Sequence, residues 1–231
     1  RKSKKKAIVI LPFRGSFINK YSFMMKKLNG KELVKYSIDA SLKCKKISKV
    51  LISSNDKKSL KILKKNYASN NKVLFHNREE KLSLFNTSIT DTLKACIKFL
   101  QNKNLKFDYV YLINTSFPFI SENDLNNSFN ILDFFKLDRV IGVLKETNNF
   151  YLHNGKTLNQ INDNSYLRLE KNEIYTEPGS LSIFNKRNMF KKKMKTGHII
   201  LEKFSCFQIK DETDFNIAKT LNKIRINQRV F

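Results

Sequence analysis

The chain is poor in glycine, proline and cysteine. Only 6 Gly and 3 Pro occur in 231 residues, so we expect short loops and mostly regular structure. The three cysteines, Cys44, Cys96 and Cys206, form no Cys-x-x-Cys pair and have no neighbouring His. This spacing excludes a zinc ribbon and a disulfide framework, and it suits a reducing cytoplasm. All three lie in apolar patterns and are predicted to be core thiols.

Apolar runs long enough for a membrane are also missing. The apolar stretch at residues 7–13 is too short to span a bilayer. It follows a basic arm, but no small-residue cleavage site comes after it, so it is not interpreted as a secretion signal. We therefore expect a cytoplasmic protein without a membrane partner.

Acidic residues are scarce. The chain has 20 Asp and Glu against 45 Lys and Arg, which gives a net charge of +25. Such an excess favours a polyanionic partner, such as nucleic acid, a nucleotide or an acidic membrane face. Nucleic-acid binders usually concentrate their basic residues on one face or in a tail. Here Lys is spread over nearly every segment together with Asn and Ile, as a drift toward AT-rich codons would also produce. Nucleic-acid binding is therefore an alternative supported by net charge alone.

Hydrophobic residues are abundant, at 41% of the chain, which is enough for one well-cored domain over residues 1–231. Their spacing alternates between the patterns of buried strands and amphipathic helices. Strands are predicted at residues 7–12, 49–54, 73–75, 109–114, 139–143 and 180–184. Helices are predicted around residues 31–44, 60–67, 89–100, 125–135 and 215–221, with Asn55 or Asp56 capping the second.

This alternation predicts a three-layer α/β/α, Rossmann-like fold with a mostly parallel central sheet covered on both faces. Ligands of such sheets bind at the carboxyl ends of the strands, where the loops converge. Between about residues 146 and 178 the rhythm changes. His153-Asn154-Gly155-Lys156 predicts a turn between short strands there, so we expect a small β-rich excursion.

The loop after the first strand is a candidate phosphate site. It contains Arg14, Gly15 and Ser16, followed by Lys20 and Lys26. Backbone amides of a glycine turn and cationic side chains both suit phosphate oxygens. The loop lacks the full P-loop and dinucleotide-binding patterns, so a basic loop without a ligand fits it equally well.

Several further motifs follow in a characteristic order. In chain order the set is Arg14-Gly15-Ser16, Leu28-Asn29-Gly30-Lys31, Ser53-Ser54-Asn55-Asp56, Arg78 with Asn86-Thr87, Asn114-Thr115-Ser116, Arg168 with Tyr175, Gly179-Ser180-Leu181 and Asp211 with Asp214-Phe215. Together they resemble the cytidylyltransferases that activate sialic-acid-like sugars, and the likeness spans almost the whole chain. No single motif is decisive, but their order and spacing are specific.

The resemblance implies a reaction and a set of site residues. In that family CTP lies across the strand ends, magnesium helps to neutralise the triphosphate, and a sugar hydroxyl attacks the α-phosphorus as pyrophosphate leaves. It implies that Arg14, Lys20 and Lys26 are catalytic, that Arg14, Gly15, Ser16, Arg78, Asn86 and Thr87 bind the nucleotide, and that Asn114, Thr115, Ser116, Arg168 and Tyr175 bind the acidic sugar. It also implies a homodimer formed through the excursion.

Structural interpretations compete with each assignment. Asn114, Thr115 and Ser116 could simply end a strand and form a turn. Arg78 could be a solvated cation, and Arg168 could serve a subunit contact. These alternatives stay open from the sequence alone.

The resemblance fails where the family holds magnesium. The family's Asp-Ile-Asp aligns with Gln208-Ile209-Lys210, and Lys210 would repel a metal ion unless its ammonium replaces part of the metal's charge. A shift of one residue brings in Asp211 as the single carboxylate for Mg²⁺, which can suffice when phosphates supply the other ligands. Three hypotheses follow: an active cytidylyltransferase, a non-catalytic relative that binds a nucleotide, sugar or partner protein, and a nucleic-acid-binding protein.

Overall fold

The computed structural model describes residues 5–15, 23–84, 86–161 and 173–228, with only the backbone for 224–228. Its elements alternate between strands and helices as the sequence predicts. In chain order they are β1 (Ala7–Pro12), β2 (Lys27–Leu28), β3 (Lys31–Glu32), α1 (Leu33–Lys43), β4 (Ile47–Ser54), α2 (Lys57–Asn66), β5 (Val73–Asn77), the 3-10 helix η1 (Glu80–Ser83), α3 (Ile89–Asn102), β6 (Tyr109–Ile113), α4 (Glu122–Phe134), β7 (Arg139–Glu146), β8 (Tyr151–His153), β9 (Leu158–Gln160), β10 (Ile174–Thr176), β11 (Leu181–Asn185), β12 (Thr196–Ile200) and α5 (Glu212–Gln228).

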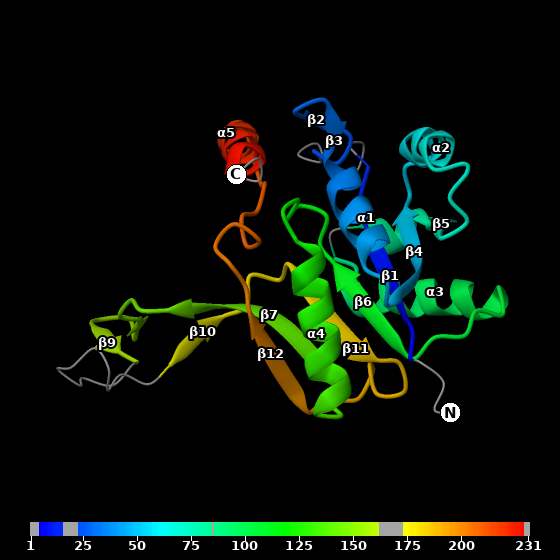
Figure 1. The fold of residues 1–231 in the computed structure, drawn as a ribbon. Helices are drawn as coiled ribbons and strands as arrows, with labels where there is room; N and C mark the ends of the chain where they lie inside the picture. Colours follow the sequence, from blue (N-terminus) through cyan, green and yellow to red (C-terminus); the bar gives the residue numbers. More distant parts are fainter. Residues whose placement is uncertain (1–4, 16–22, 85, 162–172, 229–231) are drawn as a thin grey trace.

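The central sheet is mixed and mostly parallel, as predicted. Its strand order is β10-β7-β11-β6-β1-β4-β5, and β12 pairs with β7 (Figure 1). The pairs β6–β1, β1–β4, β4–β5 and β7–β12 are parallel. Strand β11 runs antiparallel between β6 and β7. The hydrophobic pattern identified β11 as a strand but could not give its direction or its neighbours.

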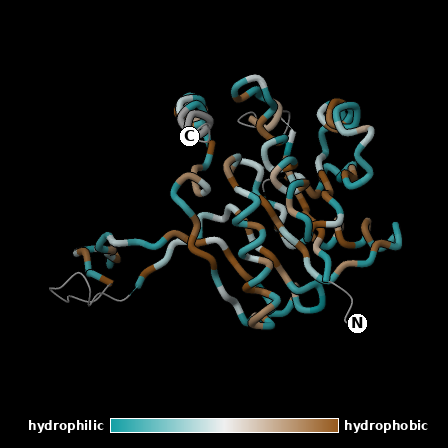
Figure 2. The backbone as a smooth tube through the Cα atoms, in the orientation of Figure 1, coloured by the Kyte–Doolittle hydropathy of each residue, from teal (hydrophilic) through white to brown (hydrophobic). Residues whose placement is uncertain are grey.

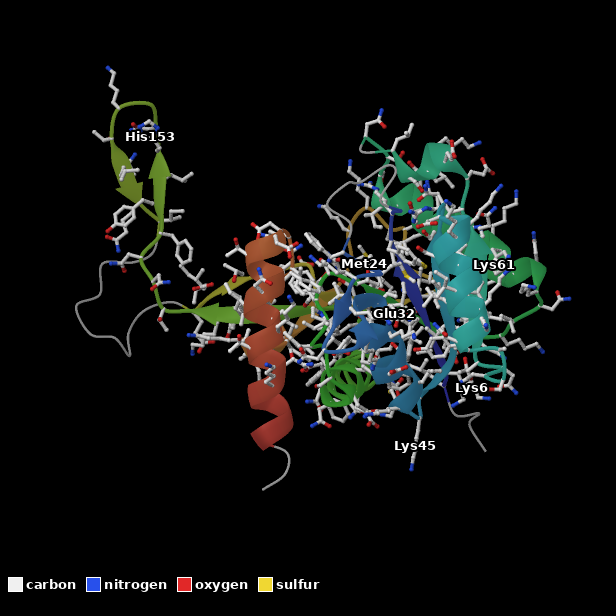
Figure 3. The ribbon with its side chains drawn as sticks, turned by 90° about the horizontal axis from the view of Figure 1, so that it is seen from above. Lys6, Met24, Glu32, Lys45, Lys61 and His153 are labelled. Atoms are coloured by element: carbon white, nitrogen blue, oxygen red, sulfur yellow. The ribbon has the colours of Figure 1, made fainter. Side chains whose placement is uncertain are left out.

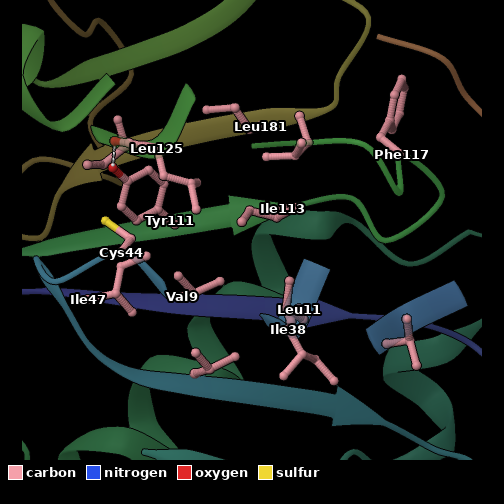
Figure 4. Packing of buried hydrophobic residues seen from close by; sticks show 14 of the residues in the cluster. Val9, Leu11, Ile38, Cys44, Ile47, Tyr111, Ile113, Phe117, Leu125 and Leu181 are labelled. Carbon is pink, nitrogen blue, oxygen red and sulfur yellow. Dashed lines mark hydrogen bonds between the residues drawn. The ribbon is translucent and has the colours of Figure 1, made fainter. Parts of the chain in front are cut away.

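Helices cover both faces of the sheet, because the strands are apolar on both. In β1, Val9 and Leu11 pack in the cluster that α1, α2 and α4 share, whereas Ile8 and Ile10 pack against α3. A strand buried on two faces reads as a continuous apolar run, as β1 does. Figure 4 shows Val9 and Leu11 along β1, with Leu11 next to Ile38 of α1, and Figure 2 shows the hydrophobic residues gathered along the central strands.

Side-chain caps place the helices against the loops at the strand ends. Of the two predicted caps of α2, Asp56 accepts a hydrogen bond from the Ser59 amide at 3.1 Å, as N-cap carboxylates do. Asn55 instead accepts from the Gly15 amide at 3.3 Å. A Cβ at Gly15 would lie 2.7 Å from the Cβ of Asp56, so glycine is needed where this loop meets α2.

The Leu28-Asn29-Gly30-Lys31 motif forms a hairpin turn. Strands β2 and β3 pair antiparallel on either side of it. Asn29 and Gly30 have φ angles of 49° and 83°, the left-handed pair that a two-residue hairpin requires. The motif therefore fixes the entry into α1.

A projecting arm lies within the region where the sequence predicts an excursion. Strands β8 and β9 make a hairpin, and Figures 1 and 3 show it extending away from the sheet, with His153 near its tip. Four large apolar side chains on it are exposed: Tyr151, Leu152, Leu158 and Ile161. Strand β10 returns along β7 antiparallel.

Two expectations from composition can be compared with the described residues. Cys44 and Cys96 are buried as predicted, but Cys206 is only half-buried. No helix in the described ranges has both the length and the apolar character needed to cross a membrane.

Candidate active-site cleft

A cleft of about 620 Å³ opens at the carboxyl ends of β1 and β6. This is the edge of an open α/β sheet at which ligands are expected. Its walls come from the loop after β1, the end of β5, the start of α3, the turn after β6, the entry to β11 and the segment before α5. The polar and charged lining residues are Arg14, Arg78, Thr87, Thr92, Asn114, Thr115, Ser116, Arg139, Glu177, Ser182, Gln208 and Lys210.

Arg78 forms a buried wall of the cleft, with 4% of its surface exposed. Its Nε donates to Ser83 Oγ and its Nη2 to the Phe13 carbonyl, both at 2.9 Å. Both acceptors are neutral, so neither cancels the guanidinium charge. Burial, together with the nearby charge of Arg14, lowers the pKa of Arg78 from its usual value, yet a guanidinium stays charged in proteins. The interpretation of Arg78 as a solvated cation is therefore wrong, since this residue holds the loop after β1 in place.

Arg14 brings a second cation to the same wall. Its Nη2 donates to the Leu84 carbonyl at 3.1 Å, across the gap between the β1 loop and the segment before α3. Thr87 lies on that segment, and its hydroxyl donates to the Lys81 carbonyl at 2.6 Å. The structure thus brings together Arg14, Arg78 and Thr87, which the sequence assigned to the nucleotide. Ser16 and Lys20 lie outside the described residues.

The turn after β6 ends the strand and also lines the cleft. Asn114 Oδ1 accepts from the Ser116 amide at 3.1 Å and from the Ser116 hydroxyl at 2.8 Å, which closes an Asx turn at the strand end. Asn114, the buried Thr115 and Ser116 also line the cleft. The structural role in the turn therefore does not exclude the predicted role in ligand binding, which stays a prediction.

The segment before α5 is tied to this turn. The Ile209 amide donates to the Ser116 carbonyl at 2.9 Å, and Gln208 Nε2 donates to Ser116 Oγ at 3.2 Å. Ile209 is 3% exposed, so it anchors the segment. Gln208 and Lys210, on either side of it, both line the cleft. The segment that the resemblance aligns with the family's metal-binding motif thus lines the cleft.

A third arginine, Arg139, lies on the β11 side of the cleft and was not predicted as a site residue. Its Nη2 donates to Glu177 Oε1 at 2.5 Å and to Ser182 Oγ at 3.2 Å. Its guanidinium lies 5.5 Å from the centre of the Phe184 ring. The buried Nε has no hydrogen-bond partner within the described chain. Arg139 begins β7 opposite Phe184, a register that exists only because β11 is inserted antiparallel, so no local sequence signal could have found it.

Several predicted site residues lie outside the lining set. The ammonium of Lys26 is 2.5 Å from Glu212 of α5 and 4.5 Å from the Phe215 ring centre, and these contacts hold it against α5. Tyr175 on β10 hydrogen-bonds to Glu173 and packs on His198. Gly15 contributes its amide to Asn55, Asn86 is exposed, and Arg168 lies outside the described residues.

The predicted metal ligand, Asp211, acts as a helix cap. Its Oδ1 accepts from the Asp214 amide at 2.9 Å and its carbonyl accepts from the Phe215 amide at 3.1 Å, so it begins α5. It is exposed and is not part of the cleft lining. The metal assignment therefore competes with a structural role that the alignment could not reveal.

The donor atoms along the cleft do not fit a magnesium ion. Mg²⁺ is held by carboxylate and phosphate oxygens. Among the described lining residues Glu177 is the single carboxylate, and it pairs with Arg139. No group of three or more His, Cys, Asp or Glu able to hold a metal occurs in the part of the chain that the structure describes. The remaining charged residues of the lining are cations.

Comparison with a family model gives one match. The model described as Cytidylyltransferase matches residues 16–226. No curated protein matches the chain in sequence.

Solved structures share the fold. The chain is similar to 4-diphosphocytidyl-2C-methyl-D-erythritol synthase from Anaerococcus prevotii DSM 20548, with 15% identity, a TM-score of 0.67 and coverage of 95% of this chain and 97% of that one. It is similar to a CMP:2-keto-3-deoxy-manno-octonic acid synthetase complexed with CTP, with 12% identity, a TM-score of 0.65 and coverage of 96% and 100%. A further 4-diphosphocytidyl-2C-methyl-D-erythritol synthase has 9% identity, a TM-score of 0.66 and coverage of 94% and 99%. At these identities the likeness establishes the fold alone.

Proposed function

The chain belongs to the cytidylyltransferase family, and from this we propose that it transfers a cytidylyl group from CTP to a hydroxyl of an acidic, nonulosonic-type sugar, giving a CMP-sugar and pyrophosphate. The observation that carries the proposal is the cleft at the sheet's carboxyl edge, where Arg14, Arg78 and Lys210 line one cavity of about 620 Å³. A triphosphate carries the charge that such a cavity can neutralise.

In the proposed complex the triphosphate lies along the cationic wall. Arg14 and Arg78 reach the wall from different elements, the loop after β1 and the end of β5, and so can contact different phosphate oxygens. Gly15 and Ser16 would add donors to the triphosphate, as the resemblance implies, and Asn86 and Thr87 would face the cytidine. Support for Thr87 is its place in the lining.

The proposed chemistry needs positioning and fixed positive charge more than a reactive side chain. The acceptor oxygen forms a bond to the α-phosphorus as the bond to the bridging oxygen breaks. The electron pair of that bond leaves with pyrophosphate, and the hydroxyl proton is released. Arg14 and Arg78, fixed by hydrogen bonds to main-chain carbonyls, would stabilise the negative charge that builds up on the leaving oxygens. Lys20 and Lys26, which the resemblance assigns to catalysis, stay proposals.

The acceptor is proposed to lie between the turn after β6 and the β11 side of the cleft. Asn114, Thr115 and Ser116 offer hydroxyl and amide groups there. Arg139 offers a buried Nε without a partner within the described chain, which suits an acceptor with a carboxylate. Arg168 and Tyr175 stay candidates from the resemblance alone.

A homodimer in the cytoplasm is part of the proposal. The arm exposes Tyr151, Leu152, Leu158 and Ile161, and such a cluster on a projecting hairpin suits burial against a second copy. Sedimentation velocity tests this part. The wild type should sediment as a dimer, and Leu152→Glu with Leu158→Glu should sediment as a monomer.

The test of the function is pyrophosphate release from each of the four nucleoside triphosphates, with and without eight- and nine-carbon keto-acid sugars. We expect release that needs both CTP and a sugar, falls at least tenfold in Arg14→Ala, and is unchanged in the exposed control Lys203→Ala. CTP binding without release in any combination would favour the non-catalytic relative. Absence of both binding and release would overturn the proposed function.

A further inference from the structure

The described lining of the cleft contains more cations than carboxylates. Its described lining contains the cations Arg14, Arg78, Arg139 and Lys210 against the single carboxylate of Glu177. That carboxylate lies 2.5 Å from Arg139 Nη2. Arg139 is therefore paired with Glu177, and the described lining offers no second carboxylate.

The main chain around Lys210 is fixed, and Lys210 lines the cleft. Ile209 is buried, and its amide donates to the Ser116 carbonyl. The Lys210 amide donates to Asp214 Oδ2 at 2.9 Å. Main-chain bonds on both residues thus fix the segment, while the exposed side chain of Lys210 is left to line the cavity.

The nearby carboxylates are committed to the start of α5. Asp211 accepts from the Asp214 amide, and Asp214 accepts from the Lys210 amide. Glu212 pairs with Lys26. None of the three is part of the described lining. In the cleft itself, Gln208 supplies an amide and Lys210 an ammonium, which is repelled by a divalent cation and attracted by phosphate.

We propose that this cleft binds its nucleoside triphosphate without a divalent cation, and that the Lys210 ammonium supplies the positive charge at the phosphates. The inference rests on the proposed function, which it makes more specific. An ammonium has three donors for phosphate oxygens, and Lys210 belongs to the segment that the resemblance aligns with the family's metal-binding motif. The ligand is therefore the free CTP anion, and magnesium competes with Lys210 for the same oxygens.

The sign of the magnesium effect distinguishes this site from a metal-dependent one. Magnesium bound to CTP removes two negative charges from the ligand. A site built on carboxylates gains affinity when the ion bridges it to the phosphates. A site built on Lys210 loses affinity, because its own cation then meets a less charged ligand.

Calorimetric titration of the full chain with CTP tests the proposal, first in EDTA and then in excess magnesium. We expect binding in EDTA that weakens when magnesium is added. Lys210→Ala should bind CTP about tenfold more weakly in EDTA, as expected for loss of one charge-assisted hydrogen bond. The exposed control Lys203→Ala should bind as the wild type does. The double variant Gln208→Asp with Lys210→Asp should reverse the effect, so that magnesium strengthens binding.

Other outcomes overturn the proposal in distinguishable ways. Binding that requires magnesium and is lost in Asp211→Ala would show a metal site at the start of α5 while leaving the proposed function intact. Equal affinity of Lys210→Ala and wild type in EDTA would remove the role of Lys210. Failure of CTP to bind in either condition would overturn the proposed function and this inference together.

Discussion

Two cations of the same cleft are held in opposite ways. Arg78 is 4% exposed and donates hydrogen bonds to the Phe13 carbonyl and the Ser83 hydroxyl. Lys210 is exposed, and its segment is fixed through main-chain amides instead. The difference separates two functions of a charge. The Arg78 side chain stabilises the fold through its hydrogen bonds, and its charge lies in the cleft wall as a result. The Lys210 side chain is not expected to stabilise the fold, because main-chain bonds hold its segment.

The largest effect on stability is expected at Arg78. Arg78→Met removes the donors of two buried acceptors, and each unpaired acceptor costs about 1 kcal/mol or more. The free energy of unfolding should fall by about 2 kcal/mol, measured by urea denaturation. The exposed control Lys81→Met should change it by less than about 0.5 kcal/mol, because its surface ion pair contributes little. Equal effects of the two variants would mean that Arg78 supports the fold no more than an exposed cation does.

An intermediate effect is expected in the turn after β6, which lines the same cleft as the two cations. Asn114→Ala leaves the Ser116 amide without its acceptor and opens the Asx turn. The free energy of unfolding should fall by about 1 kcal/mol. Asn127→Ala, on an exposed face of α4, should leave it within about 0.5 kcal/mol of the wild type. An Asn114→Ala protein as stable as the control would mean that the turn serves the ligand alone.

A smaller effect, limited to acidic pH, is expected beside Arg78. Burial, with the charge of Arg78, lowers the pKa of His76 from its usual 6.5. The unfolded chain therefore binds a proton that the folded chain resists, and this contribution to stability is present above pH 6.5 and is lost as the pH falls below it. Denaturation midpoints between pH 7.5 and 5 should decline less steeply in His76→Gln than in the wild type. The exposed His153→Gln should keep the wild-type slope, and an unchanged slope in His76→Gln would contradict the assignment.

The smallest effect is expected at Lys210. Lys210→Ala should leave the free energy of unfolding within about 0.5 kcal/mol of the wild type, even though the same variant is expected to weaken CTP binding. A loss of more than 1 kcal/mol would mean that Lys210, like Arg78, supports the fold. Urea denaturation of Lys210→Ala and Arg78→Met under the same conditions measures the two losses in the free energy of unfolding.

The sequence predicted the fold well where the signal is local. The apolar runs gave β1, β4 and β6, and helical spacing gave the helices that cover them. The position of β11 depends on long-range pairing with both β6 and β7, which no local pattern contains. Strand β12 was missed because Ile199 is its one buried residue, which leaves no apolar pattern for a sequence-based prediction.

The candidate site was predictable to the same extent. Residues that follow strands directly, such as Arg14 and Asn114, line the cleft because strand ends converge there. Arg139 was missed because its place in the cleft depends on the pairing of β7 with β11, which the local sequence does not reveal. Lys26 and Asp211 lie outside the lining because contacts with α5 occupy them, and such competition between a cap and a ligand role is invisible in an alignment of motifs.

The proposed transfer of a cytidylyl group to an acidic sugar is tested most directly by ³¹P NMR. The protein is incubated with CTP and one keto-acid sugar at a time, and the α-phosphorus signal is followed. We expect this signal to be replaced by that of a phosphodiester, in step with the appearance of pyrophosphate and only when the sugar is present. A CTP spectrum that stays unchanged with every sugar, or that shows the same hydrolysis with and without sugar, would contradict it.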